Sequence, residues 1–165
     1  MKERGPYFCD CGNHAWAILT KGFVSLISVE DASLFEDVWY AFVNQAGNIY
    51  AARRNKSKKS LYLHREILKP NGISEVDHVN RNGLDNRRFN IRPASKAQNA
   101  ANRKKGKGVS LFKGVSLARR PYQMKKPWHA TYRSTHLGYF ATEEEASAAY
   151  MKAARAAFGD FARAA

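Results

Sequence analysis

The residues of this chain best suited to chemistry are the adjacent pair Asp77 and His78, followed at longer spacing by Asn90 and Asn99. Hydrolysis of a phosphodiester needs a nucleophilic water, a base to deprotonate it and a cation to stabilise the developing charge. An imidazole whose ordinary pKa lies near neutral pH can be the base. Carboxylate and amide oxygens are hard ligands that suit Mg²⁺ or Mn²⁺ better than zinc. This set of residues predicts metal-dependent phosphodiester hydrolysis.

The expected secondary structure places these residues at the ends of elements. Residues 72–79 are typical of a strand, and residues 81–90 form a polar loop rich in Asn, Arg and Gly. A Ser-x-x-Gln capping box predicts a helix over residues 96–102. Because successive strand residues point to opposite faces, Asp77 and His78 can address one site only at a frayed strand end or a bulge.

Three segments in order along the chain are V-D-H-x-N, L-D-N-R-x-x-N-x-R and Q-N. Together they resemble the motif of the HNH homing endonucleases, from about residue 63 to residue 102. The resemblance implies a core of two strands and a helix that clamp one metal ion. The final H of HNH stands for a histidine, and this chain has Asn99 at that position, as a subset of the family does. The implied roles are metal ligand for Asp77 and Asn99, general base for His78, loop buttress for Asn90 and support of the site for His64.

The last third of the chain has a clear pattern of short strands followed by a helix. Residues 113–116, 128–133 and 136–140 are strand candidates, and a Thr-Glu-Glu-Glu capping box at residues 142–145 opens a helix. Alanine and aromatic residues recur at i, i+3 and i+4 along that helix, so one apolar face should pack on the sheet. Gly159 then ends the helix.

This region contains the patterns K-G-V-S, W-x-A, H-L-G-Y-F and T-x-E-E-A…A-Y-x-x-A-A. Through these patterns, residues 111–162 resemble the APETALA/ethylene-response DNA-binding domain. The resemblance implies a sheet that lies in the DNA major groove, fused to an HNH core as in phage and mobile-element endonucleases. Strand parity places His129, Thr131 and Arg133 on the groove face. The pattern allows two roles for Trp128, as a DNA contact or as an aromatic residue of the core.

Charge is unevenly distributed along the chain. The 165 residues carry a net charge of +14, with −3 over residues 1–50, +17 over residues 51–126 and zero over residues 127–165. A positive field in mid-chain suits a polyanion, because neutralised phosphates release condensed counterions. Ribosomal and membrane-surface proteins share such a balance, but double-stranded DNA is the favoured partner. The residues expected to contact it are Arg65, Arg87, Arg88, Arg92, Lys113, Arg119, Arg120, Trp128, His129, Thr131 and Arg133.

Cys9, Cys11 and His14 leave two interpretations open. In the first, they are half of a zinc site, although a structural zinc needs four ligands and the sequence shows no second pair. In the second, Cys9 and Cys11 are two ordinary reduced cysteines. Nothing suggests an oxidising compartment. No stretch is long and apolar enough to cross a bilayer, and no signal peptide is visible. We therefore expect no membrane partner and a cytoplasmic location, in the host cell if the protein is phage-encoded.

The expected fold class is α+β, with a β-rich segment before a ββα-metal HNH core. A C-terminal three-stranded antiparallel sheet packed on one helix completes it. Residues 1–102 should form the β-rich segment and nuclease core, residues 103–110 a basic linker, and residues 111–165 the APETALA-type domain.

Two functions follow from these expectations. The first is a homing-type DNA endonuclease that depends on Mg²⁺ or Mn²⁺ and is directed by the C-terminal domain. A monomer would nick and a dimer could cut both strands, and the sequence leaves this choice open. The second is a DNA-binding regulator that keeps the fold without catalysis. An RNA-binding protein is disfavoured, because the expected sheet lacks a row of exposed stacking aromatic residues.

Overall fold

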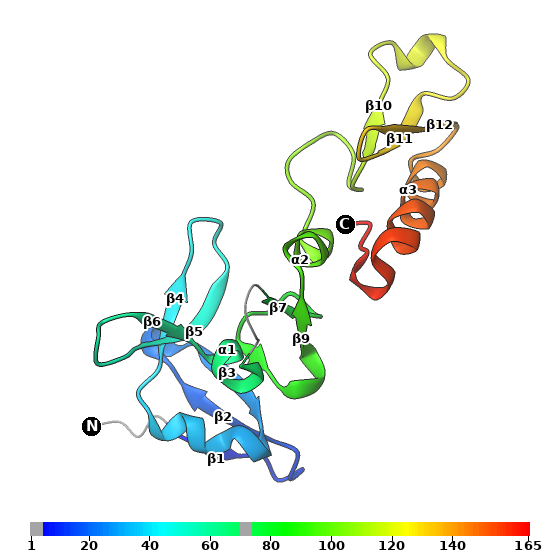
Figure 1. The fold of residues 1–165 in the computed structure, drawn as a ribbon. Helices are drawn as coiled ribbons and strands as arrows, with labels where there is room; N and C mark the ends of the chain where they lie inside the picture. Colours follow the sequence, from blue (N-terminus) through cyan, green and yellow to red (C-terminus); the bar gives the residue numbers. More distant parts are fainter. Residues whose placement is uncertain (1–4, 70–73) are drawn as a thin grey trace. The chain divides into compact units, whose positions relative to one another are not determined.

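Short strands and short helices alternate along the chain in the computed structural model, which describes residues 5–69 and 74–165 (Figure 1). The fold is mixed α+β, with several small sheets and a longer C-terminal helix. The chain divides into two units, Met1–Ser95 and Lys96–Ala165, and each is described by itself below. Among the described residues, no helix combines the length and the hydropathy needed to cross a membrane.

The first unit begins with a four-stranded sheet, which we call the N-terminal sheet. Its strands are β1 (Tyr7–Phe8), β2 (His14–Ile18), β3 (Val24–Ser28) and β8 (Asp85–Asn86), in that spatial order. Neighbours among β1, β2 and β3 are antiparallel. β8 runs parallel to β3, so the loop predicted over residues 81–90 is joined to this sheet.

The next segment supplies a second small sheet and a short helix. It consists of the 3₁₀ helix η2 (Val29–Glu36), then β4 (Tyr40–Val43), β5 (Ile49–Arg54), β6 (Ser60–Tyr62) and α1 (Leu63–Leu68). β4, β5 and β6 form an antiparallel sheet. η2 ends at Glu36, before Trp39, whose indole Nε1 donates to the Leu34 carbonyl at 2.6 Å.

The predicted nuclease motif lies on a two-stranded antiparallel sheet. β7 (Glu75–His78) pairs with β9 (Ile91–Ala94), and the loop between them contains β8 and the 3₁₀ helix η3 (Arg88–Asn90). The strand predicted over residues 72–79 is present from Glu75, and its first two residues lie outside the described part of the chain. The predicted helix follows as α2 (Lys96–Asn102).

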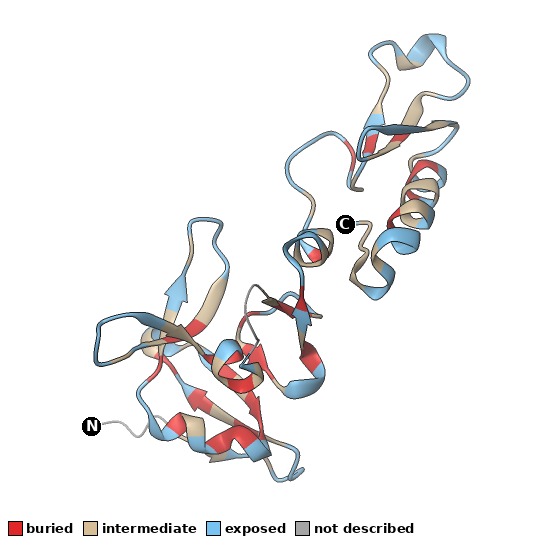
Figure 2. Ribbon diagram, in the orientation of Figure 1, coloured by how far each residue is buried: buried red, intermediate tan, exposed pale blue. Residues whose placement is uncertain are grey.

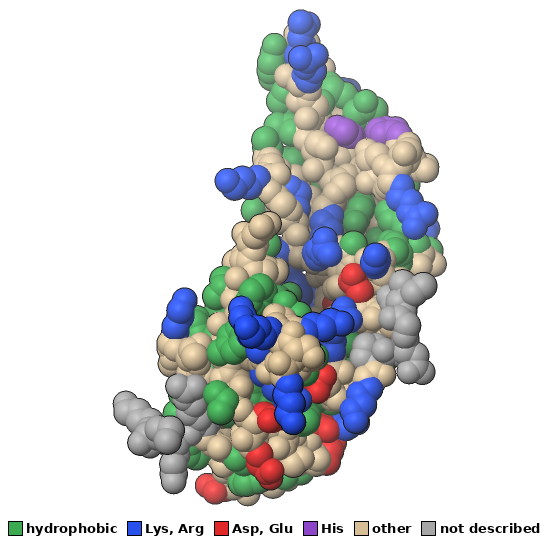
Figure 3. Space-filling model, turned by 60° about the vertical axis from the view of Figure 1, so that its left-hand side comes forward, with side chains coloured by type: hydrophobic (Ala, Val, Ile, Leu, Met, Phe, Trp, Pro, Cys, Tyr) green, Lys and Arg blue, Asp and Glu red, His purple; other side chains and the backbone are tan. Residues whose placement is uncertain are grey.

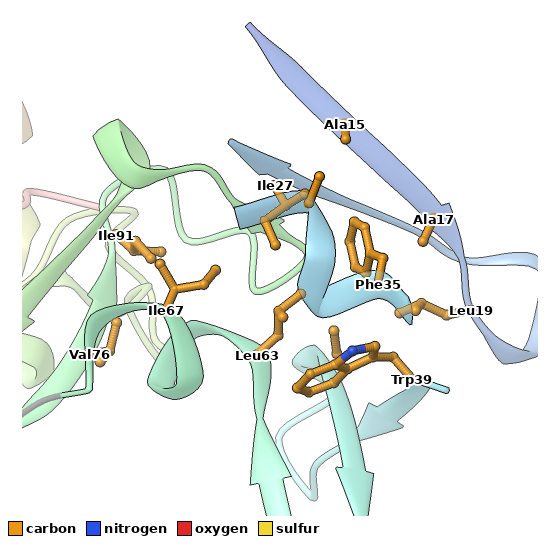
Figure 4. Packing of buried hydrophobic residues seen from close by; sticks show 12 residues of the cluster. Ala15, Ala17, Leu19, Ile27, Phe35, Trp39, Leu63, Ile67, Val76 and Ile91 are labelled. Atoms are coloured by element: carbon orange, nitrogen blue, oxygen red, sulfur yellow. The ribbon is translucent and has the colours of Figure 1, made fainter. Parts of the chain in front are cut away.

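A single apolar cluster holds the elements of the first unit together. Ile27 from β3, Leu63 from α1 and Val76 from β7 converge in it, with Phe35 and Trp39 alongside (Figure 4). Each large side chain buried in this way contributes about 1.5–3 kcal/mol relative to exposure. Buried residues follow these strands and helices in Figure 2. The β7–β9 sheet is therefore anchored to the N-terminal sheet through one apolar face.

The second unit contains a three-stranded antiparallel sheet and a helix, as predicted. Its elements are β10 (Val115–Leu117), η4 (Pro121–Gln123), β11 (Trp128–Tyr132), β12 (Thr135–Phe140), α3 (Glu143–Phe158) and η5 (Gly159–Phe161). The Thr142 hydroxyl accepts from the Glu145 amide at 3.2 Å and caps α3, and Gly159 ends the helix at a φ of 53°. Ala130 and Ala146 meet where α3 covers the sheet.

The division between the units falls at Ser95, before the basic linker predicted over residues 103–110. The reason lies in two contacts of α2. The Lys113 ammonium donates to the Ala101 carbonyl at 2.6 Å, and Arg163 Nε donates to Asn102 Oδ1 at 2.8 Å. These bonds tie the end of α2 to the second unit, so residues 103–110 form a loop inside that unit.

Candidate active site

Asn90 holds together the loop that follows β7. Its Oδ1 accepts from the Asn80 amide at 3.0 Å, and its Nδ2 donates to Asn80 Oδ1 at 3.0 Å and to the Asp85 carbonyl at 2.7 Å. Its own carbonyl accepts from the Val79 amide at 2.7 Å, and the residue is 2% exposed. One buried amide thus satisfies polar groups on both arms of the loop, which are the contacts that a loop buttress needs.

Asp85 is the second fixed point of this loop. Its carboxylate accepts two hydrogen bonds from Arg87, at 2.7 and 2.8 Å, and one from Asn80 Nδ2 at 2.9 Å. Burial by itself would raise the pKa of Asp85, but the hydrogen bond and charge of Arg87 outweigh it and hold the pKa below its ordinary value. Asp85 is therefore an anionic anchor for the loop.

A close approach between Gly83 and Tyr50 brings the same loop onto β5. A Cβ at Gly83 would overlap the Ile49 carbonyl oxygen and the Tyr50 ring, so no larger residue fits there without movement. The Tyr50 ring in turn lies 6.1 Å from the His78 ring. The glycine therefore allows the loop and the aromatic wall beside His78 to come together.

His78 occupies the last position of β7, and a polar chain determines which of its nitrogens carries the proton. Ser25 Oγ donates to the Leu84 carbonyl at 3.0 Å and accepts from Asn86 Nδ2 at 3.0 Å. The amide oxygen of Asn86 therefore faces His78, whose Nε2 lies 3.1 Å away. An amide oxygen only accepts, so Nε2 is the donor and Nδ1 is the proton-accepting atom of the neutral ring.

The surroundings of His78 keep the ring neutral. The residue is 6% exposed, and the His64 ring meets it edge-on with centroids 5.0 Å apart. Burial lowers the pKa of His78, although the bond to Asn86 and the charges of Asp77 and Asp85 oppose that shift. An unprotonated imidazole at neutral pH has the state that a general base requires.

His64 lies on α1 and is even more strongly shifted. Burial lowers its pKa to about 3, and the adjacent titratable ring of His78 and the charge of Arg65 add smaller shifts in the same direction. Its ring stacks on Tyr62 at 5.7 Å, and within the described residues its buried Nδ1 has no hydrogen-bond partner. The structure thus brings His64 against the predicted base as a neutral packing partner.

Asp77 points to the other face of β7. The strands pair in regular register, with Asp77 opposite Arg92 and His78 opposite Ile91. Arg92 Nε donates to Asp77 Oδ2 at 2.9 Å, and the Asp77 side chain is 3% exposed. No bulge interrupts this described pairing. Of the two arrangements that would let Asp77 and His78 address one site, only the strand end is left, and His78 is the last residue of β7. The carboxylate is chemically suited to Mg²⁺ or Mn²⁺, and Arg92 shares it.

Asn99 is half-buried on α2 and belongs to the second unit. Asp77 and His78 belong to the first unit.

Three of the four arginines predicted to contact DNA in the first unit have carboxylate partners. Arg87 and Arg92 bind Asp85 and Asp77, as described above. Arg88 makes two hydrogen bonds to Asp31, at 2.7 and 2.6 Å, and its amide donates to Ser28 Oγ at 2.9 Å. Bidentate pairs of this kind are strong and fix geometry. The ion pairs show a structural role that the sequence analysis missed, whereas Arg65 is exposed on α1.

In the second unit, the sheet face opposite α3 carries a cluster of His129, His136 and Tyr139. The centroid separations are 6.0 Å between the histidines, 5.9 Å for His129 and Tyr139, and 4.8 Å for His136 and Tyr139. Of these three residues, the sequence pattern indicated only His129 as a DNA contact. His136 and Tyr139 are three apart and share a face because the β11–β12 register shifts between Ala130 and Thr131.

Two predicted DNA contacts of this unit lie elsewhere. β11 ends at Tyr132, and Arg133 occupies the following turn with a φ of 54°. Its guanidinium lies 5.5 Å from the Tyr132 ring and 5.7 Å from the Phe158 ring of α3. The parity argument for Arg133 was therefore wrong, because the strand stops one residue earlier. Trp128 packs against the apolar cluster under α3, which is the core alternative left open above.

The remaining basic residues lie mainly on exposed turns. Lys56, Lys58 and Lys59 are exposed on the β5–β6 hairpin, and Arg119 and Arg120 are exposed on the β10–β11 connection. Lys113 is only partly exposed, because its ammonium binds the end of α2. Figure 3 shows Lys and Arg side chains spread widely over the visible face, whereas Asp and Glu are fewer and mostly gathered in one region.

Comparisons of the chain with protein-family models, with curated proteins and with solved structures found no match.

Proposed function

We propose that this chain is a metal-dependent DNA endonuclease of the HNH type, with His78 as the general base. The observation that supports it most is the oriented imidazole. His78 lies at a strand end, its Nε2 donates to Asn86, and its burial favours the neutral ring. A histidine packed only for stability does not need a relay of Asn86 and Ser25 to fix its tautomer.

The chemistry of the base follows from that orientation. Nδ1 removes a proton from a water, whose oxygen forms a bond to phosphorus while the bond to the leaving oxygen breaks. The imidazolium that results keeps its hydrogen bond to Asn86 Oδ1. When bound, Mg²⁺ or Mn²⁺ would stabilise the charge on the phosphorane and the leaving oxygen. Asp77 and Asn99 are the proposed ligands, and the part played by Asn99 depends on the sequence motif.

DNA is the proposed substrate because each unit carries its own exposed basic residues. The exposed lysines of the β5–β6 hairpin and the exposed arginines of the β10–β11 connection supply phosphate contacts. The sheet face that carries His129 is the proposed base-reading surface, in line with the APETALA resemblance. This arrangement would direct the first unit to a chosen sequence.

A non-catalytic DNA-binding regulator is the second candidate, and one contact favours it. The carboxylate proposed as a metal ligand already has a cationic partner, because Arg92 binds Asp77 at 2.9 Å. An Asp–Arg pair satisfies a buried carboxylate without any metal. In a nuclease, the metal must share the Asp77 carboxylate with Arg92 or displace the guanidinium from it. A regulator can keep the ion pair as it is.

The test is cleavage of supercoiled DNA that carries the native locus, with Mg²⁺ or Mn²⁺, and with EDTA as the metal-free control. The expected product is relaxed or linear DNA from the wild type. His78→Ala should lower the rate at saturating DNA by a factor of about 10²–10⁴, the usual contribution of a general base, while DNA affinity stays within twofold or so.

His129→Ala is the matched control, since it removes a histidine from the proposed reading face. It should require more DNA for half-maximal rate and leave the saturated rate unchanged. Full activity of His78→Ala would reject His78 as the base. Tight DNA binding without cleavage in any metal would support the regulator instead.

A further inference from the structure

A second cluster of metal-binding side chains lies in the first unit, at the end of the N-terminal sheet. Cys9 and His14 flank the turn between β1 and β2, and Cys11 lies within it. The Sγ atoms of both cysteines and a ring nitrogen of His14 all lie within 4.8 Å of one another. Cys11 Sγ is 3.3 Å from His14 Nδ1. The nuclease chemistry proposed above uses none of these residues.

We propose that Cys9, Cys11 and His14 bind one Zn²⁺ ion, with solvent in the fourth position. Zinc–sulfur and zinc–nitrogen bonds of about 2.3 and 2.0–2.1 Å in a tetrahedron separate two sulfurs by about 3.8 Å and a sulfur from a nitrogen by about 3.6 Å. In the structure, Cys11 Sγ and His14 Nδ1 are 3.3 Å apart, and no two of the three ligand atoms are more than 4.8 Å apart. Binding therefore changes these separations by no more than about 1.2 Å. Cys11 is exposed, so water can reach the fourth position.

The turn is built to keep the three ligands together. The Cys9 amide donates to the His14 carbonyl at 3.0 Å, which makes these residues the last pair of the hairpin. The Gly12 amide donates to the Cys9 carbonyl at 2.9 Å, and Gly12 has a φ of 70°, which favours glycine. The backbone thus fixes the spacing before any ion binds, which lowers the entropic cost of binding.

One backbone amide also points at a sulfur of the cluster. The Cys11 amide points at Cys9 Sγ from 3.3 Å, so a backbone dipole is available to stabilise a thiolate there. Two thiolates and a neutral imidazole neutralise a divalent cation. The donor set of two sulfurs and one nitrogen selects zinc over Mg²⁺, which prefers oxygen ligands. This site and the proposed nuclease site would therefore bind different metals.

The cluster lies close to the loop that supports His78. His14 is paired with Ser28 across the β2–β3 ladder, and the Ser28 hydroxyl accepts from the Arg88 amide of that loop at 2.9 Å. An ion that joins the β1–β2 turn to β2 would stiffen this end of the N-terminal sheet. We therefore expect zinc to act as a structural ion in the first unit, independently of whether the chain cleaves DNA.

The test is titration of the reduced, full-length chain with Co²⁺, followed by displacement with Zn²⁺. One equivalent of Co²⁺ should produce a sulfur-to-metal charge-transfer band and the intense visible bands of a tetrahedral ion, and Zn²⁺ should remove both. Cys11→Ser and His14→Ala should weaken binding by more than the roughly 10–100-fold expected when an outer-shell contact is lost. Cys11 is exposed, so the serine variant should fold normally.

One control variant locates the ion. His136→Ala changes an exposed histidine of the second unit and should leave the Co²⁺ spectrum and affinity unchanged. The sulfur-to-metal band belongs to the cysteine site alone, because the proposed magnesium site has only oxygen ligands. Absence of the charge-transfer band in the wild type would overturn the proposal. Equal affinity in Cys11→Ser, or a weaker band in His136→Ala, would overturn it as well.

Discussion

Acid should destabilise the first unit through His64, and the size of the effect follows from its burial. The unfolded imidazole has a pKa of 6.5, whereas burial, His78 and Arg65 lower the folded value to about 3. Between these values the unfolded chain binds a proton that the folded chain does not. Stability is therefore complete above the unfolded pKa and is lost as pH falls toward the folded pKa. At pH 4.5, two units below the unfolded pKa, His64 should cost about 2.7 kcal/mol relative to neutral pH.

The assay compares the free energy of unfolding at pH 7.5 and pH 4.5 in the wild type and in His64→Phe. Phenylalanine keeps the stacking on Tyr62 without a titrating group, so the variant should lose about 2.7 kcal/mol less than the wild type over this range. Urea unfolding followed by the fluorescence of Trp16 and Trp39 reports the first unit, provided that Trp128→Phe is present in both chains. Equal losses in the two chains would refute the assignment of His64 as a buried neutral histidine.

Three further changes test other parts of the structure. Asn90→Ala should destabilise the first unit by about 3 kcal/mol, because it leaves buried groups of the loop without partners, and slower cleavage should accompany it; unchanged urea unfolding would contradict this. Gly114→Ala should destabilise the second unit by about 2 kcal/mol or more, since φ is 64° there and a Cβ would overlap the Thr131 carbonyl, with Trp128 fluorescence as the readout. Arg88→Ala should lower the stability of the first unit even without DNA, and an effect confined to DNA affinity would mean that its pair with Asp31 contributes nothing.

Local patterns predicted the parts of the fold whose determinants lie close together in sequence. The capping box at Thr142 and the glycine at position 159 define both ends of α3, and both signals act within one helical turn. The helix that carries Asn99 begins where its capping box predicted. The three-stranded sheet of the second unit was also predicted, because its apolar residues face a helix that follows directly in the chain.

The interactions that sequence analysis missed join distant residues. The pairing of β8 with β3 and the bidentate contact of Arg88 with Asp31 connect segments separated by more than fifty residues, and no periodicity records them. An arginine in a basic stretch looks like a phosphate contact until its carboxylate partner is known. The placement of Arg133 on the groove face by strand parity failed for a different reason, because β11 ends at Tyr132 and parity does not extend to the turn residue that follows.

The position of the proposed base depends on β3 of the N-terminal sheet, although β1, β2 and β3 all lie outside the HNH motif. The loop from Asn80 to Asn90 has few apolar residues, so polar contacts must fix it. Ser25 on β3 orients Asn86, which holds His78, and Ser28 at the end of the same strand accepts from the Arg88 amide. β3 therefore supports the loop at two points that are three residues apart. It follows that the motif segment by itself should not hold His78 in one tautomer, and that the N-terminal sheet is part of the site rather than a separate module.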